Sequence, residues 1–224
     1  MNLFKTPWRI SGIAGILFVT LSLIAAGLNV QPPTYDQDQI ALPLWFAENG
    51  QRFRIAHFLA GLAFMLFYFP FFAGFFERLR QAEGQPAIWS KVAWAGAIMS
   101  PAAGTVAGAF IVGVALLGHQ VSPEVARFGV AANFYAYIVS GALSGVIMLS
   151  AATVILQTGV FERWLGWSGA FIGFSAISGS AALIENDPKG LFAAINGFAW
   201  LAYFLWIAAL SIALIRTHDC STEA

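Results

Sequence analysis

Charged residues divide the chain into six long segments that contain none of them, and this spacing constrains the fold more than any other feature. The charge-free segments lie between Arg9 and Asp36, Arg54 and Glu77, Lys91 and Glu124, Arg127 and Glu162, Arg163 and Glu185, and Lys189 and Arg216. A helix needs about 20 apolar residues to cross a hydrocarbon layer of about 30 Å. Each segment can therefore hold one membrane-spanning helix, and even the longest is too short for two helices and a turn.

Composition agrees with this reading. Apolar residues make up 59% of the chain and charged residues only 10%, whereas about a quarter of a soluble domain is charged. Most of the surface must therefore face lipid. We predict an all-α transmembrane helix bundle, forming a single integral membrane domain. Its six spans are predicted at about residues 8–28, 53–76, 89–118, 130–157, 164–184 and 191–215.

Zero net charge and a single cysteine limit the possible partners. The chain has no basic field for nucleic acid, and its one cysteine, Cys220, stands in the C-terminal tail. This arrangement excludes an internal disulfide and a cysteine metal cluster. The first apolar run is about as long as a span and lacks a convincing cleavage site, so we interpret it as a retained helix rather than a signal peptide.

Basic residues are distributed unevenly between the two sides of the predicted bundle. One side has Lys5, Arg9, Arg78, Arg80, Lys91, Arg163 and Arg216, and the other has Arg52, Arg54, Arg127 and Lys189. Cytoplasmic loops of membrane proteins are enriched in Lys and Arg. We therefore predict a multi-pass protein of the cell membrane with both termini in the cytoplasm.

The longest polar segment joins the first two spans. After Pro32 and Pro33, residues 36–49 have the pattern of a short helix that lies on the membrane, and Gly50 would end it. We predict an extracytoplasmic interfacial helix there.

Small residues recur at helical spacing in three spans. They are Gly96, Ser100, Gly104 and Gly108 in the third span, Gly141 and Gly145 in the fourth, and Gly169 and Gly173 in the fifth. Because lipid gives helices no hydrophobic reason to associate, close packing through small residues must hold much of the bundle together. We predict that these three spans pack at the centre, with the Phe-rich second span outside them.

Two histidines are the residues most suited to holding a cofactor. His57 and His119 are predicted near the same end of the bundle, where imidazole nitrogens are able to ligate haem or a metal ion. The alternative is that both are interfacial side chains beside lipid headgroups. Since neither has a nearby carboxylate or cysteine partner in the sequence, we predict no catalytic residue, no metal site and no resident cofactor, with haem as the alternative.

A polar pocket beneath the outer loops is a second candidate site. It would combine Arg52 and Arg54 with Asn133 and Tyr137 near the start of the fourth span. The alternatives are a salt bridge within the loop for the arginines and interhelical hydrogen bonds for Asn133 and Asn196, because buried amides need partners.

The overall order of elements resembles a known family. A first span is followed by an outer segment ending in FAEN at residues 46–49, then by arginines and a Gly/Ala-rich span, and later by FERWLGW at residues 161–167. This order resembles a family of functionally uncharacterised bacterial six-span integral membrane proteins. The resemblance implies six spans and a bacterial inner-membrane location, and it implies no catalytic residue.

Three function classes follow from these observations. No ionisable residue lies deep within a predicted span, although proton relays, ion pumps and carriers of charged substrates normally keep one there. We therefore expect a non-enzymatic structural or accessory protein that binds lipid, a second copy of itself or a membrane-protein partner. The alternatives are a carrier or channel for a small neutral or hydrophobic solute, and a haem- or quinone-linked redox subunit.

Overall fold

A computed structural model describes residues 7–35 and 41–216, and throughout these residues the regular structure is helical, with no strand. The helices are α1 (Pro7–Leu28), α2 (Ala41–Ala63), α3 (Phe69–Glu83), α4 (Ile88–Leu117), α5 (Pro123–Thr158), α6 (Arg163–Gly179), α7 (Ala182–Glu185) and α8 (Leu191–Arg216). A π-helical turn, η2 (Phe64–Tyr68), joins α2 to α3, and a 3₁₀ turn, η3 (Gly118–Gln120), follows α4.

Six helical stretches are long and apolar enough to cross a membrane. They are α1, the continuous stretch Leu42–Glu83, α4, α5, the stretch Arg163–Glu185 and α8. The prediction of an all-α bundle with six spans is confirmed, and the chain is a multi-pass membrane protein.

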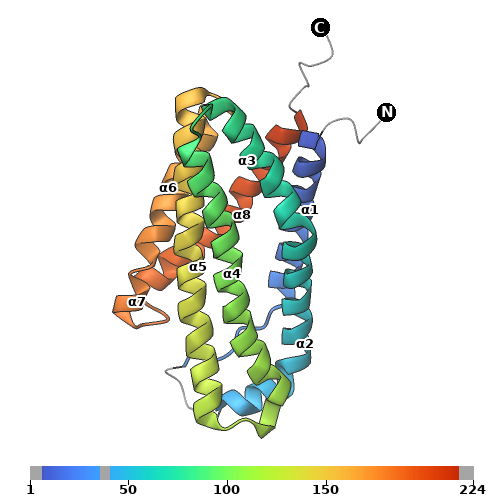
Figure 1. Ribbon diagram of the computed structural model, residues 1–224. Coiled ribbons are helices and arrows are strands. Elements are labelled where there is room, and N and C mark those ends of the chain that lie inside the picture. The colour runs from blue at the N-terminus through green and yellow to red at the C-terminus, as the bar shows by residue number, and fades with distance from the viewer. Residues whose placement is uncertain (1–6, 36–40, 217–224) are drawn as a thin grey trace.

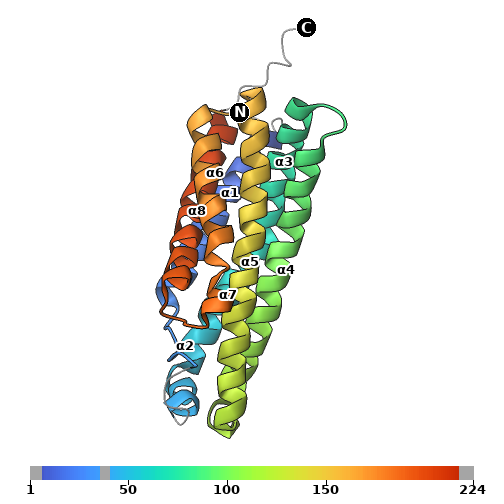
Figure 2. The same cartoon turned by 90° about the vertical axis from the view of Figure 1, so that its left-hand side faces the viewer.

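The spans form a ring in the order of the sequence (Figure 1, Figure 2). Each span packs against its neighbours along the chain, and α1 packs against α8 to close the ring. The start of α1 and the end of α8 lie at the same end of the bundle, which we call the terminal end; the opposite end is the distal end.

The first turns of α2 correct the prediction of a separate interfacial helix. The helix does not stop at Gly50 but continues to Ala63, and Figure 1 shows its first turns crossing the distal end before the helix turns along the bundle. A Cβ at Gly50 would lie 3.0 Å from the carbonyl oxygen of Ala115, so this glycine allows α2 to approach α4 closely. Residues 36–40 of the predicted helix lie outside the described residues.

Packing at the distal end explains the course of this segment. Leu42 and Phe46 are buried against a small core formed by the ends of α4 and α5, together with Phe53. An amphipathic pattern alone predicts one apolar face, and it does not distinguish a membrane surface from a protein surface.

The Phe-rich half of the second span was predicted outside the central helices, and this prediction is wrong. Phe71, Phe72 and Phe75 are fully buried in the main core. The ring of Phe75 lies 5.9 Å from both Phe161 and Trp206, measured between centroids. The rings therefore fill the space between α3, α8 and the turn before α6.

Proline affects the two middle spans differently. Pro70 is the second residue after η2, and because proline lacks an N–H it cannot donate the usual helical bond to the carbonyl oxygen four residues back. A π turn of this kind occurs mostly as a single-turn bulge within a longer α-helix. In contrast, α4 remains helical through Pro101.

Close contacts between small residues are concentrated on α5. A Cβ at Gly145 would lie 2.7 Å from the carbonyl oxygen of Gly173, and one at Gly173 would lie 2.9 Å from that of Gly145. A Cβ at Gly96 would lie 2.8 Å from Ile147. The backbones of α5 and α6 therefore touch at Gly145 and Gly173.

The remaining small residues have different surroundings. Gly141 faces Asn196 and Trp200, and Gly169 faces the indole of Trp206, so both lie against α8. A Cβ at Gly104 would meet only an ordinary contact at 3.5 Å, and one at Gly108 would meet no atom within 4 Å. The four-residue pattern in α4 therefore makes close contacts only in its first half.

Candidate functional site

Three serines form a buried hydroxyl network between α4 and α5. Ser100 Oγ donates to the carbonyl oxygen of Ser140 at 2.9 Å and lies 2.8 Å from Ser144 Oγ, while Ser140 Oγ donates to the carbonyl oxygen of Ser100 at 2.7 Å. Residues four apart share one helix face, so Ser140 and Ser144 both face α4. The network satisfies polar groups that lipid could not satisfy.

A small cavity, which we call the central cavity, lies beside this network. The space open to the centre of a water-sized sphere is about 10 Å³, which is close to the room that one water molecule needs. Its lining comes from α5, α6 and α8, and consists of Gly141, Ser144, Met148, Ala176, Asn196, Ala199, Trp200 and Tyr203.

Two nitrogen donors converge on Gly141 at this cavity. Asn196 Nδ2 and Trp200 Nε1 would lie 2.6 Å and 3.2 Å from a Cβ at Gly141. Both are buried and have no hydrogen-bond partner among the described residues. A buried donor without a partner costs about 1–3 kcal/mol. The cavity therefore suits a hydrogen-bond acceptor about the size of one water.

The four residues predicted to line an outer pocket mostly have separate partners. Arg52 Nε donates to the carbonyl oxygen of Leu28 at 2.9 Å, at the end of α1, where a cation also complements the helix dipole. Arg54 Nε donates to the carbonyl oxygen of Gly50 at 3.2 Å within α2.

The other two members of that predicted pocket lie on α5. Asn133 is half-buried, and Tyr137 stacks on Trp200 with 4.9 Å between ring centroids. Tyr137 thus lies beside the central cavity rather than with the arginines.

A tyrosine cluster at the distal end was not predicted as a unit. Tyr35 donates to Asn186 Oδ1 at 3.2 Å, and the hydroxyl of Tyr135 donates to the same oxygen. Asn186 ends α7 with a left-handed backbone, a conformation that asparagine tolerates well. The three residues come from distant segments that only the fold brings together.

The predicted histidine pair is only partly described. The Nδ1 atom of His57 lies 3.0 Å from the carbonyl oxygen of Phe53 in its own helix, and the imidazole lies over the Phe53 ring at 4.1 Å. The backbone of His119 belongs to η3, whereas its side chain lies outside the described residues. Haem ligation by this pair stays a prediction.

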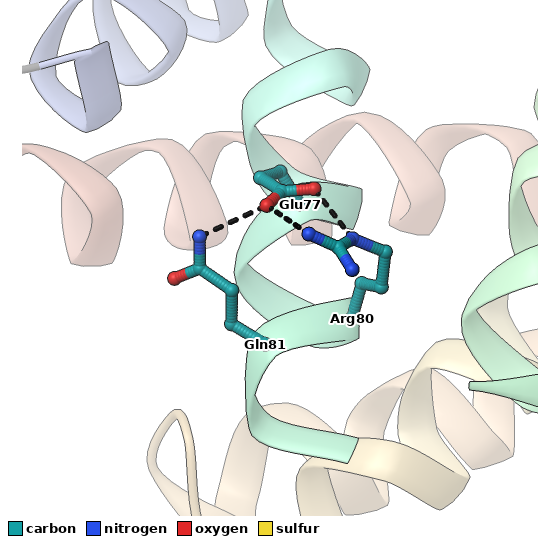
Figure 3. A network of polar contacts seen from close by, with 3 residues as sticks. All are labelled: Glu77, Arg80 and Gln81. Carbon is teal, nitrogen blue, oxygen red and sulfur yellow. Dashed lines mark hydrogen bonds and ion pairs between the residues drawn. The ribbon is translucent and has the colours of Figure 1, made fainter. Parts of the chain in front are cut away.

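The terminal end holds its carboxylates in hydrogen bonds. Figure 3 shows Glu77 accepting two bonds from Arg80, at 2.7 Å and 2.6 Å, and a third from Gln81 at 2.9 Å. Glu83 accepts from the backbone N–H of Trp89 and from the N–H and hydroxyl of Ser90, and so caps the start of α4.

Comparison of the chain with models of known protein families, with curated proteins and with solved structures finds no match. The resemblance to a bacterial six-span family therefore stays a prediction.

Proposed function

We propose that the protein is a non-enzymatic accessory protein of the plasma membrane that acts by binding membrane lipid. The observation that supports this most is the filled interior of the helix ring. Aromatic side chains occupy the main core, and the central cavity has room for about one water. A ligand larger than water must therefore bind at the outer surface or at an end of the bundle, where the surrounding molecules are lipids.

Lipid retention tests this function directly. We expect protein purified in mild detergent to keep phospholipid through size-exclusion chromatography, at about one molecule or more per chain as measured by mass spectrometry. Proteoliposomes should take up glycerol and urea no faster than empty liposomes. Purified protein that keeps no lipid would contradict the proposal.

A second candidate function is a carrier for a small neutral solute. It is favoured by the π turn η2, which interrupts the second span shortly before Pro70 and places the side chain of Tyr68, with its hydroxyl group, in the core. Such turns often occur at functional sites. Saturable uptake of a neutral solute by proteoliposomes, abolished by Tyr68→Phe, would favour this candidate over lipid binding.

We also propose that both termini are cytoplasmic, in a bacterial inner membrane. Among the described residues the terminal end has six basic and three acidic side chains, whereas the distal end has four of each. Because Lys and Arg favour the cytoplasmic side, this asymmetry supports the orientation.

Cys220 allows the orientation to be measured, since it is the one cysteine of the chain and stands in the C-terminal tail. We expect a membrane-impermeant maleimide to label Cys220 only after spheroplasts are permeabilised. In the control, Cys220→Ser combined with Lys189→Cys should be labelled in intact spheroplasts. The reverse labelling pattern would contradict this orientation and place both termini outside the cytoplasm.

A further inference from the structure

A second pocket lies at the terminal end, where α3 meets the turn between α5 and α6. It is open, has a volume of about 270 Å³, and is lined by Arg78, Gln81, Ala82, Thr158 and Val160. We call it the terminal pocket. It offers more than twenty times the space of the central cavity, so it has room for a small chemical group rather than a single water.

Arg78 is the charged residue of this pocket. Its Nε atom is buried and has no hydrogen-bond partner among the described residues. Its guanidinium carbon lies 5.8 Å from the centroid of the Trp8 ring, a geometry in which the ring attracts and orients the cation. The Trp8 ring therefore holds Arg78 in place, and no ion pair of its guanidinium is found among the described residues.

The other polar lining groups already have partners. The hydroxyl of Thr158 donates to the carbonyl oxygen of Val154 at 2.8 Å, and Gln81 donates to Glu77 at 2.9 Å. Glu77 itself is paired with Arg80 (Figure 3) in the one ion pair found among the described residues. No described carboxylate therefore neutralises Arg78, and the pocket suits an anion.

The height of the pocket indicates where that anion comes from. Four exposed tryptophans mark the terminal end of the spans, namely Trp89, Trp94, Trp164 and Trp167. Tryptophan is enriched at the level of the lipid headgroups. The terminal pocket thus lies at the depth of the lipid phosphates, on the side with the excess of basic residues.

We propose that the terminal pocket binds the phosphate of an anionic phospholipid headgroup, with Arg78 as the charged donor. This inference rests on the proposed lipid-binding function and names the class of lipid and the residue that selects it. Arginine suits this role because its planar fork binds two phosphate oxygens at once. Basic pockets between spans on the cytoplasmic side are a recognised kind of headgroup site.

Native mass spectrometry of the full-length protein tests this. Phosphatidylglycerol and phosphatidylcholine with matched acyl chains are added to wild-type protein and to Arg78→Gln, Ala82→Trp and Arg216→Gln. We expect the wild type to prefer phosphatidylglycerol by about fivefold, the factor expected of one arginine near anionic headgroups. Arg78→Gln should lose the preference because it removes the positive charge. Ala82→Trp should lose it because the indole fills the pocket, although Arg78 itself is unchanged.

Arg216→Gln is the matched control, because it removes an exposed charge at the same end, outside the pocket lining. An equal loss in Arg216→Gln, or a retained preference in Arg78→Gln, would overturn the pocket assignment while leaving lipid binding intact. Wild-type protein that binds neither lipid would overturn the proposed function as well. Displacement of the lipid by inorganic phosphate would show that the pocket takes a free anion instead.

Discussion

Gly145→Leu is expected to destabilise the bundle severely. A Cβ at this position would lie 2.7 Å from the carbonyl oxygen of Gly173 and 2.8 Å from Ile177 Cγ1. The first of these atoms is backbone, so it cannot rotate away and α5 and α6 must separate. We expect the free energy of unfolding to fall by about 3 kcal/mol, the upper end of the typical cost of overpacking a core. This corresponds to a fall in melting temperature of roughly 6–12 °C for a chain of this size.

Gly108→Leu is the matched control for this experiment. A Cβ there would meet no atom within 4 Å, so the larger side chain has open space. The melting temperature of Gly108→Leu, measured in the same detergent as that of Gly145→Leu, should stay close to the wild-type value. If both variants melt alike, the close contact between α5 and α6 does not stabilise the bundle.

Phe75→Ala is expected to have the second large effect. Phe75 is fully buried, and its ring packs against Phe161 and Trp206. Truncation leaves a cavity among rigid rings that cannot collapse to fill it. Buried Phe→Ala changes typically lower the free energy of unfolding by about 3–5 kcal/mol. For a chain of this size, that predicts a fall of roughly 6–20 °C in melting temperature.

Phe58→Ala, in the same span, provides the comparison. Phe58 is 64% exposed and faces the surrounding lipid or detergent, so its truncation leaves no internal cavity. We expect the free energy of unfolding to change by no more than about 0.5 kcal/mol, as for other exposed positions. A larger loss for Phe58→Ala than for Phe75→Ala would reverse the assignment of inner and outer faces in this span.

The candidate site was only partly predictable. Asn196, Ser100 and Tyr137 stand out in the sequence as polar groups inside apolar runs. The structure buries Asn196 and Ser100 and stacks Tyr137 on Trp200. Their neighbours were not predictable. Ser100 bonds to serines of another span, and Trp200, which lies beside Asn196 and Tyr137, is an ordinary aromatic residue in the sequence. Arg78 was counted only for orientation, since nothing local indicates that its partner is a tryptophan and not a carboxylate.

Spacing of charges alone determined the six spans, their order and the shared end at which the first span begins and the last span ends. This succeeds because burying a charge in hydrocarbon is costly wherever it occurs, so each charge-free run marks a span. Tertiary structure alone decided which face of each span points inward. In a soluble protein an apolar stripe marks the core, but here lipid is as apolar as the core. Phe58 and Phe75 therefore look alike in the sequence, and only the packing of neighbouring helices separates them.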